Sequence, residues 1–199
     1  MKAATAYPTL IDRLWPNQGS ALTRTVLLAA FGSLLLWASA KVQVPMWPVP
    51  MTMQSFAVLV IGMAYGARLA TATVGLYLLE GALGLPVFAG TPEQGIGFLY
   101  MMGPTGGFLV GFLIAAAAMG WLAEHGWDRT LPKAVAAMVL GTILLFTPGI
   151  LWLTVLFGGT NAIAVGLTPF ILGSVLKLAL AAALMPLAWK AVDGRRGHR

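Results

Sequence analysis

Apolar residues run along this chain in six stretches, and the segments outside these stretches hold most of the charges and prolines and half of the glycines. A helix that crosses a bilayer needs about 20 predominantly apolar residues, with a range of about 17 to 25. The pattern therefore predicts six membrane-spanning helices, at residues 23–40, 52–65, 68–85, 106–123, 133–157 and 169–189. The fifth stretch is long and contains a Thr-Pro-Gly sequence at 147–149, where we expect a kink.

Lysine and arginine residues fall almost entirely on one side of this arrangement. If the chain starts in the cytoplasm, the inner segments contain Lys2, Arg13, Arg24, Arg68, Arg129, Lys133, Lys190, Arg195, Arg196 and Arg199. The outer segments contain only Lys41, and Lys177 lies within the last apolar stretch. Because cytoplasmic loops are enriched in Lys and Arg, this asymmetry predicts that both termini are cytoplasmic.

The composition points to the same class of protein. Hydrophobic residues make up 59% of the 199 residues and charged residues 9%, whereas soluble domains carry roughly 25% charged residues. We therefore predict an all-α integral membrane protein with a single membrane domain over residues 1–199. Residues 20–190 would form its six-helix core, 1–20 a cytoplasmic N-terminal segment and 190–199 a basic cytoplasmic tail. The net charge of +6 is spread along the chain, which argues against a nucleic-acid partner.

The three predicted outer loops, at residues 41–51, 86–105 and 158–168, are rich in Gly, Pro and apolar residues and nearly free of charge. The stretch 84–108 alone contains seven glycines and three prolines. Irregular backbone at membrane depth is tolerated where it is buried in protein or lines a cavity. The loops are therefore expected to form a lid over a ligand cavity, or to pack as re-entrant segments without a ligand.

Two ionisable residues, Glu80 and Lys177, fall within the predicted spans. At a rise of about 1.5 Å per residue, both would lie roughly 12 Å below the outer edge of a hydrocarbon core about 30 Å thick. A charge at that depth is costly and often functional. The two residues would form either a structural ion pair or part of a polar ligand site. Ser174 and Gly173 would share the helix face of Lys177.

Other polar residues near the predicted lid are Thr52, Gln54, Thr105 and Asn161. Each would either contact a ligand or satisfy the backbone at a helix end. In the first span, Ala29 and Ser33 are small residues four positions apart, a pattern that allows close approach of another helix. The pattern is common by chance and does not by itself identify a partner.

Several kinds of chemistry have no motif in this sequence. There is no cysteine, and the only histidines, His125 and His198, fall in predicted cytoplasmic segments. Zinc-hydrolase HExxH, nucleophile-elbow GxSxG, paired-aspartate and phosphate-binding Walker A sequences are absent. We therefore expect no enzyme activity, metal or cofactor. A transporter without its own motor would need either an ion gradient or a partner, and inverted repeats typical of gradient-driven transporters are not evident.

Three sequence motifs together resemble the biotin-specific substrate-binding subunit, the BioY family, of energy-coupling-factor transporters. They are VPMTMQ at 49–54, GLPVFAG at 84–90 and GPTGGF at 103–108. The resemblance extends over about residues 20–190, including the layout of six spans. It implies a multi-pass subunit in the plasma membrane of a prokaryote that captures biotin from outside beneath a lid of outer loops.

The resemblance also implies partners. In the family the subunit docks on a transmembrane coupling protein and two ATPase subunits through small residues of its first helix, a role that would fall to Ala29 and Ser33. A homo-oligomer is also compatible with the resemblance. Some members occur without a dedicated ATPase module, so dependence on a partner stays open.

The family's sixth helix carries Gly-Asp-x-x-Lys, with both polar residues touching the ligand. Here Lys177 is kept but Ser174 replaces the aspartate. We hypothesise that Glu80 supplies the missing carboxylate. The residues expected to contact the ligand are Lys177, Ser174, Glu80, Gln54, Phe88, Gly90, Tyr100 and Thr105.

Three other functions are weighed against biotin uptake. The chain could be a stand-alone facilitator for another small vitamin or apolar acid, a membrane enzyme with a lipid-soluble substrate, or a structural subunit whose apolar loops only pack. Tight stoichiometric binding of a ligand would distinguish a ligand-binding subunit from a structural subunit. Turnover of a bound ligand would indicate an enzyme.

Overall fold

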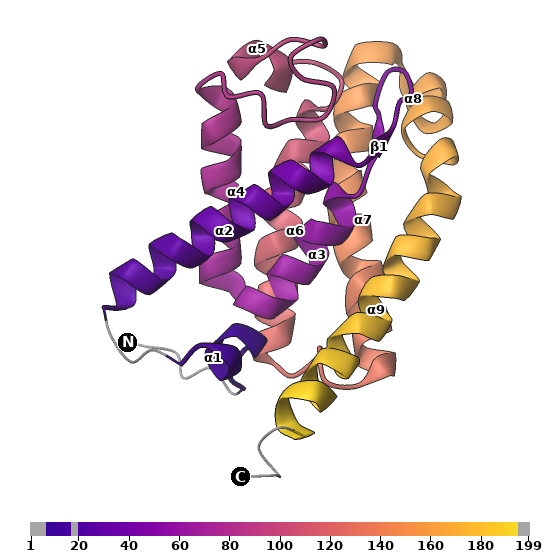
Figure 1. Ribbon diagram of the computed structural model, residues 1–199. Coiled ribbons are helices and arrows are strands. Elements are labelled where there is room, and N and C mark those ends of the chain that lie inside the picture. Colours follow the sequence, from indigo (N-terminus) through magenta and orange to yellow (C-terminus); the bar gives the residue numbers. More distant parts are fainter. Residues whose placement is uncertain (1–6, 17–19, 195–199) are drawn as a thin grey trace.

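The computed structural model describes residues 7–16 and 20–194, and these form a largely helical protein (Figure 1). Six helices of 12 residues or more are present in the described part: α2 Ala21–Lys41, α3 Gln54–Tyr65, α4 Ala67–Ala82, α6 Gly106–Glu124, α7 Leu131–Phe157 and α9 Ile171–Gly194. The shorter elements are α1 Leu10–Leu14, α5 Gly97–Met101, α8 Gly159–Gly166 and the 3-10 turn η1 Thr168–Phe170. A small antiparallel hairpin pairs β1 Gln43–Val44 with β2 Met51–Thr52.

Each of the six predicted spans overlaps one long helix. The largest difference in bounds lies at the end of the last span, because α9 continues to Gly194, while at its start Thr168–Phe170 forms a 3-10 turn before α9 begins. Helix α7 continues through Pro148 as one helix. Within residues 7–16 and 20–194, four helical segments are long and apolar enough to cross a membrane, namely Ala21–Lys41, Gly106–Glu124, Leu131–Phe157 and Gly159–Asp193. Helix α3 is apolar but shorter.

Helix α6 lies at the centre, packed against α3, α4 and α7. Helix α2 crosses α4 and α3 at a steep tilt, and α9 packs on α7 and α3 (Figure 1). Glycines allow the closest approaches, because a Cβ at Gly111 would collide with the carbonyl oxygen of Leu145 on α7, and one at Gly120 with the backbone of Ala67 on α4. Small residues therefore fix the spacing of the central helices.

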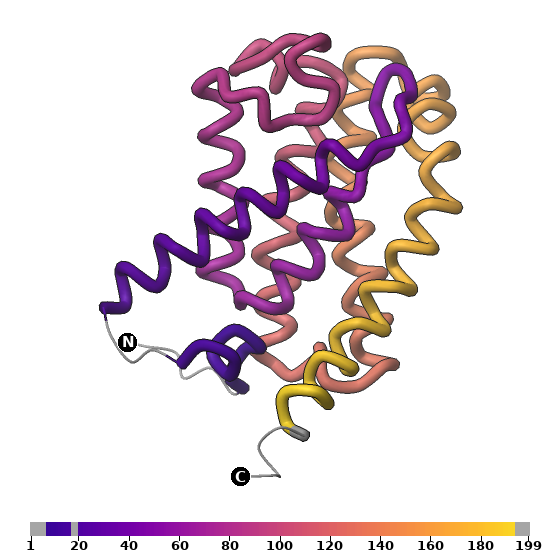
Figure 2. The backbone as a smooth tube through the Cα atoms, viewed as in Figure 1, coloured from indigo at the N-terminus to yellow at the C-terminus, as the bar shows by residue number. Residues whose placement is uncertain are grey.

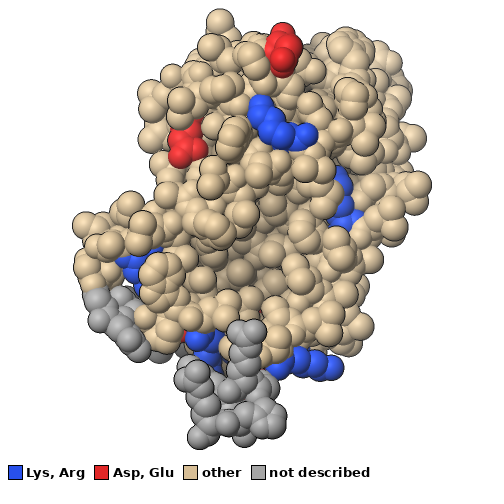
Figure 3. Space-filling view, in the orientation of Figure 1, with Lys and Arg blue, Asp and Glu red and all other residues tan. Residues whose placement is uncertain are grey.

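The outward faces of the long helices carry large apolar side chains, such as Phe31 on α2, Leu151 on α7 and Leu172 on α9. The face seen in Figure 3 has few charged side chains, widely separated from one another. A water-soluble protein rarely exposes so large an apolar surface, whereas lipid tails would cover it favourably. The surface agrees with the apolar composition and with a membrane location.

The ends of the bundle differ. The hairpin, α5 and α8 lie at one end, and α1 and the last turns of α9 at the other (Figure 2). At the α1 end, Trp189 donates from its indole Nε1 to the buried carboxylate of Asp128 at 2.5 Å, and the Arg129 guanidinium lies 4.1 Å from the Trp189 ring centroid. Arg129 also donates to the carbonyl of Pro8 at 3.1 Å. These contacts join α9, the α6–α7 loop and the segment before α1.

Candidate functional site

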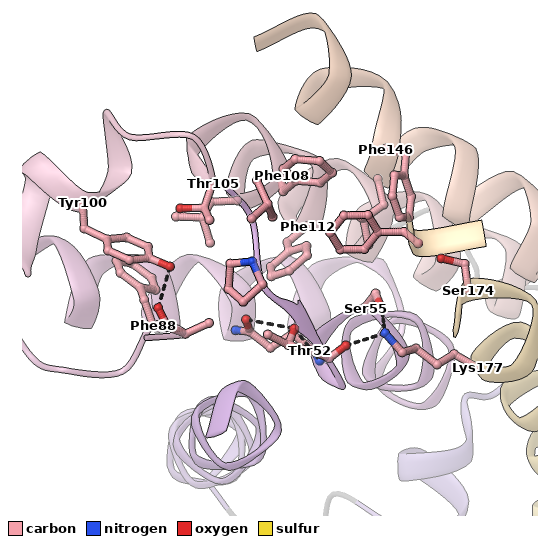
Figure 4. Close-up of a pocket in the computed structure, with 17 residues that line it drawn as sticks. Thr52, Ser55, Phe88, Tyr100, Thr105, Phe108, Phe112, Phe146, Ser174 and Lys177 are labelled. Carbon is pink, nitrogen blue, oxygen red and sulfur yellow. Dashed lines mark hydrogen bonds between the residues drawn. The ribbon is translucent and has the colours of Figure 1, made fainter. Parts of the chain in front are cut away.

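A cavity lies at the end of the bundle that carries the hairpin and α5 (Figure 4). Its walls come from β2, α3, α6, α7, η1, α9 and the segment 83–105 between α4 and α6, here named the α4–α6 connection. The residues that line it are Val49, Pro50, Thr52, Gln54, Ser55, Phe88, Ala89, Tyr100, Thr105, Phe108, Leu109, Phe112, Leu145, Phe146, Phe170, Ser174 and Lys177. Concave sites lined by aromatic residues with a few polar groups are typical of small-molecule binding.

The polar side of the cavity is made where the hairpin leads into α3. Thr52 ends β2, and its hydroxyl accepts a hydrogen bond from the backbone N–H of Gln54 at 3.2 Å, at the first turn of α3. Gln54 is buried and donates from Nε2 to the hydroxyl of Tyr77 at 2.6 Å. Ser55 follows on α3 and also lines the cavity. A buried amide held in this way keeps one orientation.

Lys177 is the one charged side chain among the described residues that line the cavity. It is half-buried on α9, and its ammonium donates to the backbone carbonyl of Thr52 at 2.5 Å and to the Ser55 hydroxyl at 3.4 Å (Figure 4). Ser174, one turn earlier on α9, lines the same cavity. An ammonium has three donors and no acceptor, so it can also bind a carboxylate or carbonyl of a ligand.

The remaining walls are aromatic. The Phe108 ring lies 5.6 Å from Phe146 edge-on and 6.4 Å from Phe170, and the Phe88 ring stacks on Tyr100 at 5.0 Å between centroids. Aromatic pairs in these arrangements bury much apolar area and are stiff. The cavity therefore offers a firm apolar surface next to a single cation.

The α4–α6 connection is fixed by hydrogen bonds from three aromatic side chains, one of its own and two of neighbouring helices. The Tyr77 hydroxyl donates to the carbonyl of Val87 at 2.9 Å, the Tyr100 hydroxyl to that of Ala89 at 2.8 Å, and the Trp152 indole to that of Gly103 at 2.9 Å. These donors replace the partners that irregular backbone would otherwise lack. The connection is therefore an ordered wall of the cavity.

Six of the eight residues predicted to contact a ligand line this cavity: Gln54, Phe88, Tyr100, Thr105, Ser174 and Lys177. Glu80 and Gly90 are not among the lining residues. The Glu80 carboxylate accepts a hydrogen bond from the Ser33 hydroxyl, and Glu80 makes no ion pair with Lys177 in the described structure. The geometry therefore gives no support to the hypothesis that Glu80 replaces the missing aspartate, because its side chain faces α2.

The residues predicted to contact a partner, Ala29 and Ser33, are buried within the helix bundle. Ala29 is 7% exposed and Ser33 1% exposed, and Gly32 between them packs against Thr73 of α4. The small-residue face of α2 thus packs on α4 in this structure. The exposed face of α2 carries large residues, including Phe31, Leu34 and Leu35.

Sequence reasoning missed several lining residues, chiefly Ser55 and the aromatic residues Phe112, Phe146 and Phe170. Ser55 directly follows Gln54 and could have been found as a further polar residue at the start of a span. The aromatic residues carry no such signal. A phenylalanine in an apolar helix can face lipid, the protein core or a cavity, and the sequence does not distinguish these environments.

Comparison with known proteins identifies the family. A model of the BioY family matches residues 10–194. The chain belongs to the BioY family. The Thermotoga maritima protein named "Biotin transporter BioY" is 33% identical over 174 residues, which cover 87% of this chain and 99% of that protein. The Rhizobium etli protein of the same name is 36% identical over 169 residues, 80% of this chain and 89% of that one.

A solved structure shares the fold of this BioY-family chain. It is a crystal structure, at 2.1 Å, of "the S-component for biotin from an ECF-type ABC transporter", with a TM-score of 0.73 and 21% identity over 85% of this chain and 92% of that chain. The predicted family is thus confirmed. The curated relatives are named as biotin transporters, and the chain is accordingly a member of a transporter family and not an enzyme.

Proposed function

We propose that this chain is a biotin-binding membrane subunit for biotin uptake. The observation that carries the proposal is the cavity, where the ammonium of Lys177 lies among uncharged polar side chains and aromatic rings. Biotin has a carboxylate on an apolar chain and a polar ureido ring. A single cation suits its carboxylate, and neutral groups such as those of Gln54, Thr105 and Ser174 suit hydrogen bonds to the ureido group.

The proposed placement in the membrane has six spanning helices, both termini in the cytoplasm and the cavity near the outer side. It is supported by the asymmetric distribution of Lys and Arg and by the apolar outward faces of the helices. The α4–α6 connection would then be a lid over the ligand, in the plasma membrane of a prokaryote. Helix α3, with 12 residues, would depend on its neighbours because it is too short to span the core alone.

We also propose that uptake depends on a transmembrane coupling protein and ATPase subunits, as the family resemblance implies. The similar crystal structure is named as the S-component of an ECF-type ABC transporter, which supports this proposal. Contact through Ala29 and Ser33 would require α2 to separate from α4, since both residues are buried. The exposed apolar face of α2 offers a contact that needs no such separation. A partner-free facilitator, as a monomer or homo-oligomer, is the competing arrangement.

The decisive test is a calorimetric titration of purified, biotin-stripped protein with biotin in lipid nanodiscs. We expect saturable binding of one biotin per chain. Biotin methyl ester, which lacks the carboxylate charge, should bind more weakly if Lys177 anchors that end. Failure of folded protein to bind biotin would overturn the proposal, and binding of another small apolar acid in the same experiment would favour the competing ligand class.

A further inference from the structure

Lys41, in the last turn of α2, forms hydrogen bonds from that helix to the α4–α6 connection. Its ammonium donates to three acceptors, the carbonyl of Phe88 at 3.2 Å, the carbonyl of Thr91 at 3.0 Å and the hydroxyl of Thr91 at 3.3 Å. Phe88 lies 47 residues further along the chain. One side chain therefore uses all three of its donors on a single turn of backbone.

Within this turn, the hydroxyl and the backbone N–H of Thr91 donate to the carbonyl of Phe88, at 2.7 and 3.4 Å, and further donors come from other elements. The consecutive carbonyls of Val87, Phe88 and Ala89 accept hydrogen bonds from Tyr77 of α4, Lys41 of α2 and Tyr100 of α5, respectively. Three helices thus hold three successive peptide groups. Because bonds from an ammonium are charge-assisted, the Lys41 contacts are expected to be stronger than those from a neutral donor.

The position of the turn sets one wall of the cavity. Phe88 and Ala89 both line it, and the Phe88 ring is 1% exposed. The ring occupies the space beside Gly81, where a Cβ would collide with it, and contacts Tyr77 edge-on at 5.5 Å between centroids. If the turn lifted, Phe88 would leave this slot and the cavity would open at that wall.

Lys41 differs from the other two donors because it is not part of the apolar core cluster of the described structure. Like Tyr77, and unlike Tyr100, it does not line the cavity. Tyr77 and Tyr100 also contribute their rings to packing, so their substitution changes more than a hydrogen bond. The role of Lys41 can therefore be separated experimentally from the shape of the site.

We propose that Lys41 is a positioning residue for the ligand site: it holds the 88–91 turn against the cavity and thereby slows release of the bound ligand without touching it. The proposal rests on the proposed function for its ligand. Lid-like segments that must open for release control the dissociation rate more than the association rate. Loss of the ammonium should therefore shorten the residence time of the ligand.

The first experiment measures release of labelled biotin after a chase with unlabelled biotin. We expect Lys41→Met, which keeps the aliphatic stem, to accelerate release about tenfold, as for loss of a charged hydrogen-bond donor. Lys41→Arg keeps a charged donor and should restore most of the residence time. Lys133→Met removes an exposed lysine near the start of α7, outside this site, and serves as the matched control, with release unchanged.

A second experiment needs no ligand. The natural sequence has no cysteine, so Glu93→Cys, in the exposed part of the α4–α6 connection, can carry a single spin label. The label should become more mobile when Lys41→Met is added and stay unchanged with Lys133→Met. Thr91→Val removes one acceptor of Lys41 and also the hydroxyl that donates to the Phe88 carbonyl at 2.7 Å, so it should raise the mobility as well.

The outcomes are separable. Release from Lys41→Met within twofold of the parent protein, or an unchanged label mobility, would overturn the proposed role of Lys41. Acceleration that Lys41→Arg does not reverse would do the same, because it would indicate a merely structural position. If the parent protein bound no biotin, the proposed function would fail, while the label experiment would still decide whether Lys41 holds the turn.

Discussion

The ammonium of Lys177 on α9 donates a hydrogen bond to the backbone carbonyl of Thr52, 125 positions earlier in the chain, at 2.5 Å. This bond joins the last helix to the start of α3 and sets the cation at the polar side of the cavity. Since a carbonyl cannot neutralise the charge, the ammonium keeps its attraction for an anionic ligand. Under the proposed function, this ammonium is the group that would bind the carboxylate of the ligand.

Lys177→Met should weaken biotin binding about 10- to 100-fold, because it removes a charged donor from a partly dry site. Calorimetry on the purified variant measures the change. Lys190→Met, an exposed lysine on the same helix, is the control and should bind like the parent protein. A Lys177→Met protein with full affinity would show that the ligand's charged end lies elsewhere.

Glu80→Gln should leave the affinity for biotin within about twofold, since the Glu80 side chain bonds to Ser33 and does not line the cavity. The glutamine can still accept a hydrogen bond from the serine hydroxyl. The measurement is the same titration, run beside Lys177→Met. A loss as large as that of Lys177→Met would contradict this prediction and support the hypothesis that Glu80 replaces the family's aspartate.

Tyr77→Phe should lower the free energy of unfolding by about 1–3 kcal/mol, because it leaves the amide nitrogen of buried Gln54 and the carbonyl of Val87 without their partner. Tyr100→Phe removes one bond, to the carbonyl of Ala89, and should cost about 1 kcal/mol or less. Thermal unfolding of both variants in one detergent gives the comparison. Equal losses would indicate that the Gln54 amide finds another partner.

Gly111→Ala should destabilise the protein by about 1–3 kcal/mol or prevent its folding, because the new methyl group would meet the backbone carbonyl of Leu145 across the α6–α7 contact. Gly75→Ala is the matched control. Its Cβ would have no neighbour within 4 Å, so the change should be neutral or raise stability by up to about 1 kcal/mol. Thermal unfolding measures both, and similar values for the two variants would contradict the close packing.

Asp128 predicts a dependence of stability on pH at the α1 end. Burial raises the pKa of this carboxyl above its ordinary value of 3.8, although the Trp189 indole and Arg129 act in the opposite direction. A group with a raised pKa in the folded state binds its proton more readily when folded. Its contribution to stability is therefore fully present below 3.8 and is lost as the pH rises through the higher folded value.

Asp128→Asn should remove this part of the pH dependence, since the amide stays neutral and can still accept from the Trp189 indole. As the pH is raised from about 4 to about 7, the unfolding temperature should fall more for the parent protein than for the variant. Glu93→Gln changes an exposed carboxylate and serves as the control. The same slope for Asp128→Asn and the parent would contradict a raised pKa.

Much of the fold could be predicted from local patterns. The six apolar stretches became the six long helices, with ends displaced by a few residues where turns intervene, as at Thr168–Phe170. The Gly- and Pro-rich stretch between α4 and α6 became a wall of the cavity. These features follow from the hydrophobicity and turn preferences of neighbouring residues, which the sequence displays directly.

The sequence by itself determined how far along its helix each polar residue lies, because every helical residue adds about 1.5 Å. It placed Glu80 and Lys177 at the same depth. Only the tertiary structure decided that Lys177 faces the cavity while Glu80 faces Ser33 on α2. The direction of a side chain around the helix axis has meaning only relative to neighbouring helices. In an apolar bundle the tilt and rotation of those helices are set by packing, which residue spacing along one helix does not record.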